Sequence, residues 1–291
     1  MTWTTLIDTE TVANRLTDPA FVIIDCRYSV EDPSWGGREY LREHIPGAAF
    51  ASIDDDLSAP KTGTNGRHPL PDPEVAVRTF ARFGISAGIQ VAAYDQDAGM
   101  YASRLWWMLR WLGHDAVAVL DGGFMKWLAE ERPVRPGTET YPPGDFRGSP
   151  RLGWVADAAA VQKVLGSPDW LLLDARAPER YRGEVEPVDK IAGHIPGAAN
   201  HFYKWNVNDD GTFRSAEEIT DAFRKSIGRT SVSRVICYCG SGVTACQDLL
   251  ALEYAGLPGA RLYPGSWSEW LSDPSRPIER GPAPYTTHDT R

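Results

Sequence analysis

Residues 235–245, V-I-C-Y-C-G-S-G-V-T-A, decide how this chain folds. The first five form a continuous apolar run that predicts a buried strand, and a helical pattern begins near Val243. Similar apolar runs alternate with amphipathic helices along the chain, which is typical of a parallel sheet covered by helices on both faces. Ligands of such sheets bind beyond the carboxyl ends of the strands. We therefore expect Cys239, the last residue of this run, to lie at a site.

The glycines of this loop, Gly240 and Gly242, allow the backbone to curl tightly. A curled loop at a helix start directs several N–H groups and the positive end of the helix dipole toward one point. A thiol there is expected to ionise readily, so we predict that Cys239 is a nucleophile. The alternative is a buried structural cysteine. The residues predicted to bind the anion are Gly240, Ser241, Gly242, Val243 and Thr244.

Four segments recur in the same order, about 150 residues apart, and predict a duplicated domain. The pairs are FVIIDCR (21–27) with LLLDAR (171–176), HIPGAAF (44–50) with HIPGAAN (194–200), VAAYDQ (91–96) with VICYCG (235–240), and GGFMKW (122–127) with GSWSEW (265–270). We assign residues 1–135 to the first copy, 136–152 to a linker rich in Pro and Gly, and 153–291 to the second copy with its tail. Asp95 replaces Cys239 in the first copy, which we expect to be catalytically silent.

Composition excludes several classes of function. The 291 residues are enough for about two domains, and the net charge of −9 is unsuited to binding a nucleic acid. We expect a cytoplasmic protein with no membrane partner, because no apolar run reaches the length of a membrane span. The cysteines are too few for a disulfide scaffold, and Cys237 with Cys239 lacks the further ligands of a zinc site. No metal or organic cofactor is expected.

Several residues are expected to serve packing alone. Cys26, Cys237 and Cys246 are assigned to the core, although a bond between Cys246 and Cys239 in an oxidised state stays open. His44 and His194 begin the repeated HIPG motif in both copies and are expected to be structural. The tryptophans expected in the core or between the domains are Trp106, Trp107, Trp111, Trp267 and Trp270. The tail from Ser275 is expected to be an extended strap or disordered.

The double HIPGA motif, the GSWSEW segment and the loop CGSGVTA resemble the two-domain rhodanese-like sulfurtransferases over nearly the whole chain. The loop is most similar to that of the mercaptopyruvate branch. The thiosulfate branch has basic residues at the second and third loop positions, where this chain has Gly240 and Ser241. The resemblance implies transfer of a sulfane sulfur from 3-mercaptopyruvate, through a persulfide on Cys239, to a thiol, cyanide or thioredoxin-like acceptor.

The resemblance also implies roles for residues outside the loop. Arg180 matches the position that binds the substrate carboxylate, and Ser241, His68 and Asp54 match a proton relay. The alternatives are a surface arginine, a solvated loop histidine, and an aspartate misplaced by its acidic neighbours.

One departure concerns the second carboxylate-binding arginine of the family. The segment before GHIPG has no arginine at that place, and Lys190 and Arg182 are the candidate substitutes. This departure leaves the identity of the donor open.

Three other functions are compatible with parts of the pattern. A thiosulfate:cyanide sulfurtransferase would share the fold and the cysteine, but it favours basic residues beside a dianion. A cysteine-dependent phosphatase needs an arginine in its loop, and residues 239–245 contain none. A non-catalytic rhodanese-like binding module would release no pyruvate from 3-mercaptopyruvate.

Overall fold

The computed structural model describes residues 2–96 and 98–282, which form two compact units. The first unit contains the residues up to Ala59, Leu70–Arg151 and Val207–Phe213. The second contains Pro60–Pro69, Leu152–Asn206 and the residues from Arg214 onward. The two sequence repeats therefore do not map simply onto the two units, because each repeat contributes a short segment to the other repeat's unit. The boundaries 1–135, 136–152 and 153–291 stay a prediction.

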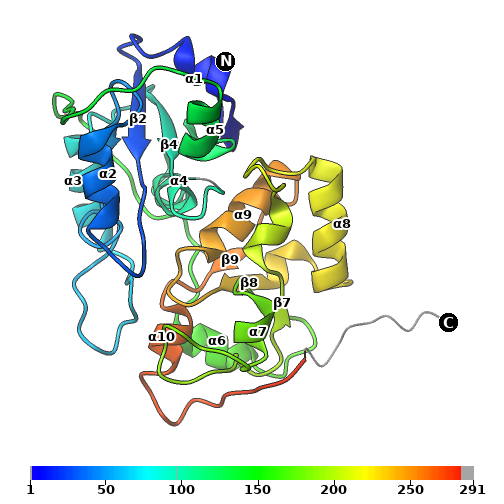
Figure 1. Ribbon diagram of the computed structural model, residues 1–291. Helices are drawn as coiled ribbons and strands as arrows, with labels where there is room; N and C mark the ends of the chain where they lie inside the picture. The colour runs from blue at the N-terminus through cyan, green and yellow to red at the C-terminus, as the bar shows by residue number, and fades with distance from the viewer. Residues whose placement is uncertain (1, 97, 283–291) are drawn as a thin grey trace. The chain divides into compact units, whose positions relative to one another are not determined.

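The first unit is built on a parallel sheet of five strands in the order β1-β5-β4-β2-β3 among its described residues. Helices α2 and α3 cover one side of β2 and β4, and α1 and α5 lie on the other (Figure 1). The strands are β1 (Leu6–Ile7), β2 (Phe21–Asp25), β3 (Ala49–Phe50), β4 (Gln90–Tyr94) and β5 (Val117–Leu120). The helices are α1 (Thr9–Ala13), α2 (Trp35–Arg42), α3 (Pro73–Arg82), α4 (Ala102–Trp111) and α5 (Gly123–Ala129).

The second unit repeats this plan, with a parallel sheet in the order β7-β6-β8-β9. Helices α8 and α9 lie on one face of the sheet, and α6, α7 and α10 on the other (Figure 1). The strands are β6 (Leu171–Asp174), β7 (Ala199–Asn200), β8 (Val235–Tyr238) and β9 (Arg261–Leu262). The helices are α6 (Ala158–Val164), α7 (Pro178–Tyr181), α8 (Ala216–Ile227), α9 (Ala245–Tyr254) and α10 (Ser266–Trp270), with short 3₁₀ turns at Tyr203–Asn206 and Val232–Arg234. The predicted parallel α/β architecture is confirmed.

The repeated sequence D-x-R forms the same buried ion pair in both units. Arg27 and Arg176 bind Asp25 and Asp174 through their Nη2 atoms at 2.7 and 2.6 Å. In each case the same guanidinium also donates to the backbone carbonyl just before the HIPG motif, at 2.7 Å. In each unit these contacts hold the carboxyl end of a central strand, β2 or β6, against the backbone at the start of the HIPG motif. Removing one partner of such a pair leaves a buried charge, at a cost of about 3–5 kcal/mol.

The residues assigned to packing occupy structural positions. His44 and His194 are fully buried, donate from Nδ1 to Tyr40 and Tyr181 carbonyls, and stack on the rings of those tyrosines. The five tryptophans are buried, as predicted for core residues: Trp106, Trp107, Trp111, Trp267 and Trp270. The tail forms a strap as far as Pro282, because the backbone of Glu279 pairs with that of His194. Residues 283–291 lie outside the described residues.

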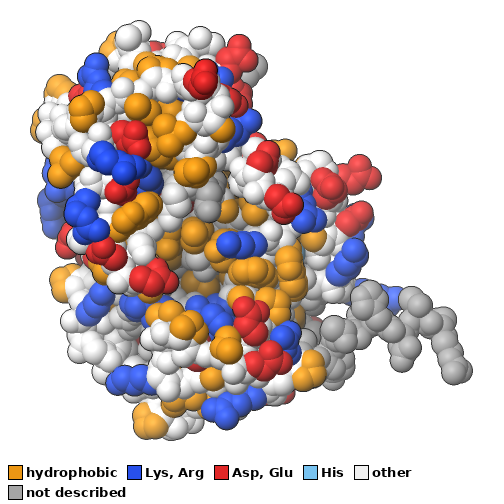
Figure 2. All heavy atoms as spheres, in the orientation of Figure 1, with side chains coloured by type: hydrophobic (Ala, Val, Ile, Leu, Met, Phe, Trp, Pro, Cys, Tyr) orange, Lys and Arg blue, Asp and Glu red, His pale blue; other side chains and the backbone are white. Residues whose placement is uncertain are grey.

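Acidic and basic side chains are interspersed on the face shown in Figure 2, where neither sign forms a continuous stripe. No helix among residues 2–96 and 98–282 is both long enough and apolar enough to cross a membrane.

A buried polar network joins α8 and α9 to the turn after β7. His201 is fully buried, and its Nε2 lies 2.9 Å from the Asn206 Oδ1 atom, which accepts the hydrogen bond. The Nδ2 group of Asn206 donates to Gln247 and to Asp248. Burial lowers the pKa of His201 to about 4, despite the hydrogen bond to Asn206. Burial raises the pKa of Asp248 well above its usual value.

We predict that His201 makes the fold sensitive to acid. Between its unfolded pKa, about 6.5, and its folded pKa, about 4, the unfolded chain binds a proton that the folded chain does not. Stability therefore falls as the pH falls through this window, by roughly 3 kcal/mol in total. Urea unfolding of His201→Gln from pH 7 to pH 4 should lack this part of the slope.

Asp248 changes the pH dependence of stability with the opposite sign, because its pKa is raised in the folded state. The contribution of His201 is therefore the difference in slope between the parent protein and His201→Gln. Phe223→Leu is the matched control, since it removes the ring stacked on His201 and leaves the titrating group in place. It should lower the free energy of unfolding and keep the slope. An unchanged slope in His201→Gln would refute the assignment.

Candidate functional site

The loop between β8 and α9 carries Cys239 directly after the last residue of the strand. Its Sγ atom accepts a hydrogen bond from the Gly242 N–H at 3.1 Å, and the residue is only 2% exposed. A backbone N–H in this position can donate a hydrogen bond to the sulfur when negative charge develops on it. The structure thus places a polar donor of the loop on the sulfur, although the cysteine itself is buried.

The start of α10 holds this loop in place. The Trp267 N–H donates to the Cys239 carbonyl at 3.0 Å, and the Ser268 N–H donates to the Gly240 carbonyl at 2.9 Å. The Cys239 N–H donates to Ser266 Oγ at 3.1 Å. The repeated motif at residues 265–270 therefore has a clear physical task, since its first turn fixes the backbone around the cysteine.

Gly242 is the position of this loop that least tolerates a side chain. Its φ is +75°, and a Cβ atom built there would lie 2.2 Å from the carbonyl oxygen of Pro264. Both the backbone conformation and the close approach require glycine. Since the same residue donates to Cys239 Sγ, this requirement bears directly on the sulfur.

The first unit shows what the equivalent loop does without the cysteine. Asp95 is fully buried, and its carboxylate accepts hydrogen bonds from three loop N–H groups. The donors are Gly99 at 3.0 Å, Tyr101 at 2.7 Å and Ala102 at 3.0 Å. The three N–H groups of this loop therefore point at the Asp95 carboxylate, which accepts their hydrogen bonds.

Ser241 and His68 meet beside the cysteine. The Ser241 Oγ and His68 Nδ1 atoms lie 2.8 Å apart, and both residues are buried. The pair forms because His68 lies in the segment Pro60–Pro69, which belongs to the second unit. Asp54 lies in the first unit, where its carboxylate accepts a hydrogen bond from the Tyr28 hydroxyl at 2.8 Å. Its place in a relay with His68 stays a prediction.

Arg180 is held by acidic residues of its own unit. Its Nη2 atom lies 2.6 Å from Glu186 Oε1 and 3.3 Å from Asp189 Oδ2, and its side chain is 19% exposed. Burial acts to raise the pKa of Glu186, but hydrogen bonds from Arg180 and from backbone N–H groups hold it below the usual value. Arg180 is therefore largely buried, and two carboxylates fix its guanidinium; its binding of a substrate carboxylate stays a prediction.

Neither candidate substitute for a second arginine makes a hydrogen bond or an ion pair with the loop among the described residues. Arg182 pairs with Glu184, two residues further along the chain, at 2.7 Å. Lys190 is exposed, and the described residues give it no ion pair.

Arg67 supplies a guanidinium that sequence analysis missed. Its Nη1 atom lies 2.6 Å from Asp189 Oδ1. A Cβ atom built on Gly240 would lie 2.8 Å from Arg67 Nη2 and 3.7 Å from Arg180 Nη2, so both guanidiniums border the loop at this glycine. The only signal in the sequence was that Arg67 precedes His68, a predicted site residue.

The other cysteines are buried away from solvent and, like Cys239, are not in a disulfide. Burial raises the pKa of Cys26 and of Cys237 well above the usual value, which keeps both thiols protonated. Cys246 donates from Sγ to the Gly242 carbonyl at 3.4 Å. Among the described residues, no group of three or more His, Cys, Asp or Glu side chains is arranged to hold a metal ion.

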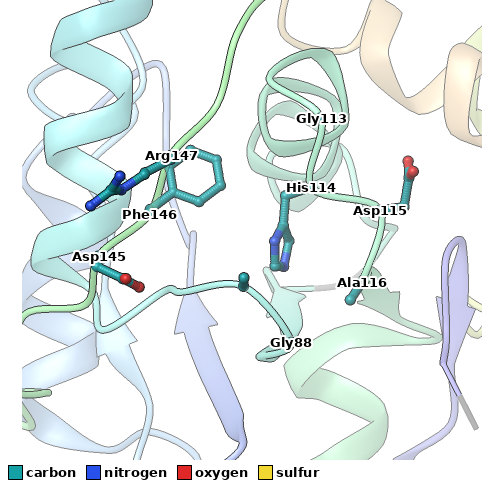
Figure 3. A pocket seen from close by; sticks show the side chains of 9 residues that line it. Gly88, Gly113, His114, Asp115, Ala116, Asp145, Phe146 and Arg147 are labelled. Carbon is teal, nitrogen blue, oxygen red and sulfur yellow. The ribbon is translucent and has the colours of Figure 1, made fainter.

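The first unit contains a cavity of about 430 Å³ that includes none of the predicted site residues. Figure 3 shows it between the loops at Gly88 and His114 and the segment of Asp145 to Arg147. Gly88 and Ala116 precede β4 and β5, so the cavity lies at the amino ends of those strands. Parallel sheets bind ligands at the opposite, carboxyl ends. The cavity is therefore separate from the candidate site.

We predict that Gly242→Ala disrupts the loop that holds Cys239. The substitution combines a strained φ, which costs about 1–2 kcal/mol, with a clash against the Pro264 carbonyl. Gly256→Ala is the matched control, because Gly256 has φ +74° and no heavy atom within 4 Å of its added Cβ. The midpoint temperature of thermal unfolding and the rate at which iodoacetamide labels Cys239 should both change strongly in Gly242→Ala. Both should change little in Gly256→Ala. Equal behaviour of the two variants would contradict this role of Gly242.

Comparisons with known proteins identify the family of this chain. The model of the rhodanese-like domain matches residues 8–130 and 157–273. The chain is 46% identical over 278 residues to a protein of Pseudomonas aeruginosa named "Probable 3-mercaptopyruvate sulfurtransferase", covering 95% of this chain and 98% of that one. It is 33% identical to the thiosulfate sulfurtransferase of Cricetulus griseus, covering 90% and 89%. The 3-mercaptopyruvate sulfurtransferase structure from Leishmania major matches with a TM-score of 0.80 and 32% identity, over 94% of this chain and 75% of that one. The chain therefore belongs to the family of two-domain rhodanese-like sulfurtransferases.

Proposed function

We propose that this enzyme transfers sulfur from 3-mercaptopyruvate to a thiol or cyanide acceptor through a persulfide on Cys239. The observation that carries the proposal is the hydrogen bond from the Gly242 N–H to Cys239 Sγ. This donor can stabilise either the thiolate or the terminal persulfide anion. The loop of the first unit supports this role, because its N–H groups bind the carboxylate of Asp95.

The proposed first step is attack of the Cys239 thiolate on the sulfur of the donor. A sulfur–sulfur bond forms, the carbon–sulfur bond of the donor breaks, and its electron pair leaves as the enolate of pyruvate. The enolate takes up the proton that the donor thiol carried, which gives pyruvate and an enzyme persulfide anion. In the second step the acceptor attacks the outer sulfur and restores the Cys239 thiolate.

The Ser241–His68 pair is proposed to move the proton in the first step. The hydroxyl lies two residues from the nucleophile, and its 2.8 Å contact with His68 couples it to a group that can exchange protons near neutral pH. Asp54 is proposed to orient His68 in the working enzyme. This part of the relay depends on a residue of the first unit.

The donor is proposed to be a monoanion carrying a carboxylate, bound by Arg180. The loop side chains next to the cysteine, Gly240 and Ser241, carry no charge. Arg180 is already matched by Glu186 and Asp189, so the site offers little excess positive charge for a dianion such as thiosulfate. A donor carboxylate can instead use the remaining guanidinium N–H groups.

The chemistry of the reaction suggests the cellular compartment and the kind of acceptor. A free thiolate and an acceptor thiol persist in a reducing compartment, so we place the enzyme in the cytoplasm. A thioredoxin-like protein is a suitable acceptor, because its own thiolate can attack the persulfide. No nucleic acid or membrane partner is proposed.

We predict that Cys239→Ser loses pyruvate release from 3-mercaptopyruvate by at least about 10³-fold, because a serine hydroxyl is a far weaker nucleophile for sulfur. Coupled assay of pyruvate with lactate dehydrogenase measures this rate directly. Cys26→Ala is the matched control, since it removes a buried cysteine that directly follows strand β2 of the first unit. It should retain the parent rate.

The same assay, run with thiosulfate and cyanide and read as thiocyanate, separates the two donors. A higher kcat/KM for thiosulfate than for 3-mercaptopyruvate would overturn the proposed donor. An unchanged rate in Cys239→Ser would overturn the mechanism.

A further inference from the structure

A chain of alternating charges runs through the second unit and ends at the loop. Its members are Asp174, Arg176, Glu186, Arg180, Asp189 and Arg67. Each successive pair is within 3.3 Å, and the four inner members are no more than 19% exposed. Three acidic and three basic residues make up this chain of charges, and Arg67 is its end member at the loop.

Arg67 is the member at the loop, and its donors are only partly used. Nη1 donates to Asp189, whereas the Nε atom is buried and has no hydrogen-bond partner among the described residues. Nη2 is the atom that lies 2.8 Å from a Cβ built on Gly240, and the structure gives it no acceptor within residues 2–96 and 98–282. A guanidinium with unused donors beside the nucleophile's loop has the chemistry to bind a carboxylate.

The backbone around Arg67 is anchored, so this placement is a property of the fold. The Arg67 N–H donates to Ser268 Oγ at 2.9 Å. Gly66 has φ +86°, and its backbone approaches the Gly265 carbonyl so closely that an added Cβ would lie 2.9 Å from that oxygen. The Ser272 hydroxyl donates to the Thr64 carbonyl at 3.0 Å. The residues around α10 thus position both Cys239 and Arg67.

We propose that Arg67 binds the carboxylate of the donor together with Arg180, and that Asp189 holds the two guanidiniums apart across Gly240. This inference rests on the proposed function for the identity of the donor. The absence of a side chain at Gly240 lets the Arg67 guanidinium approach the loop backbone closely, since an added Cβ would lie 2.8 Å from Nη2. Arg67 thereby provides a second positive charge at the loop.

The test compares an anionic with a neutral reagent of similar size at Cys239. Iodoacetate carries a carboxylate and iodoacetamide does not, so the ratio of their alkylation rates reports the binding of a carboxylate beside the sulfur. Arg67→Gln should lower this ratio roughly ten-fold, because it removes a charged donor. The rates are followed by mass spectrometry of the peptide that contains Cys239.

Arg182→Gln is the matched control, since it removes an arginine of the same unit whose ion pair, among the described residues, is with Glu184. It should keep the parent ratio. Arg67→Gln leaves Asp189 unpaired, so Arg67→Gln/Asp189→Asn is made as well, and thermal unfolding is measured for each variant. The double variant keeps the local charge balanced and should still show the lowered ratio. Arg67→Lys keeps the positive charge but lacks the forked geometry of a guanidinium, so its ratio of alkylation rates should lie between those of the parent and Arg67→Gln.

Steady-state kinetics with 3-mercaptopyruvate complete the test. Arg67→Gln should raise KM roughly ten-fold with a smaller change in kcat, because the contact is made in the bound donor as well as in the transition state. An unchanged alkylation ratio in both Arg67→Gln and the double variant overturns the role of Arg67, whatever the parent does with 3-mercaptopyruvate. A lowered ratio in an enzyme that releases no pyruvate supports the carboxylate site and overturns the proposed donor.

Discussion

The two backbone hydrogen bonds from the first turn of α10 to the carbonyls of Cys239 and Gly240 are the contacts on which the site depends. With those carbonyls turned toward α10, the loop can direct the Gly242 N–H back onto the sulfur. Gly242 also packs closely against the carbonyl of Pro264, in the segment that leads into α10. A strand, a curled loop and a helix start are thus held as one rigid element, which is how a protein prepares hydrogen-bond donors before charge develops.

Duplication explains why one loop is proposed to react and the other is not. Helix α5 holds the first loop as α10 holds the second, through bonds from Phe124 and Met125 N–H to the carbonyls of Asp95 and Gln96. In the first unit the side chain at the strand end is a carboxylate that consumes the loop donors and fixes the structure. In the second unit the side chain is a cysteine, whose Sγ accepts a hydrogen bond from the Gly242 N–H, and we propose that this sulfur reacts. The residue at the end of the strand thus differs between two loops that are held in the same way.

Much of the fold could be predicted from residues 235–245 and the repeats, because strand and helix periodicity are local properties. Helix α8, Ala216–Ile227, begins at a capping box formed by Ser215 and Glu218, which is a local signal in the sequence. Short elements such as α7 and β7 gave no periodic signal and were missed. The grouping of Pro60–Pro69 with the second unit was also missed, since it depends on contacts far apart in the chain. The role we propose for Arg67 arises from that grouping, which no local pattern indicates.

Whether Cys239 carries the transferred sulfur can be measured by mass spectrometry of the enzyme after incubation with 3-mercaptopyruvate in the absence of an acceptor. We expect the peptide containing Cys239 to gain the mass of one sulfur atom and to lose it when cyanide or a thiol is added. Release of pyruvate with the added sulfur on Cys26, Cys237 or Cys246, or on no cysteine at all, would contradict the account.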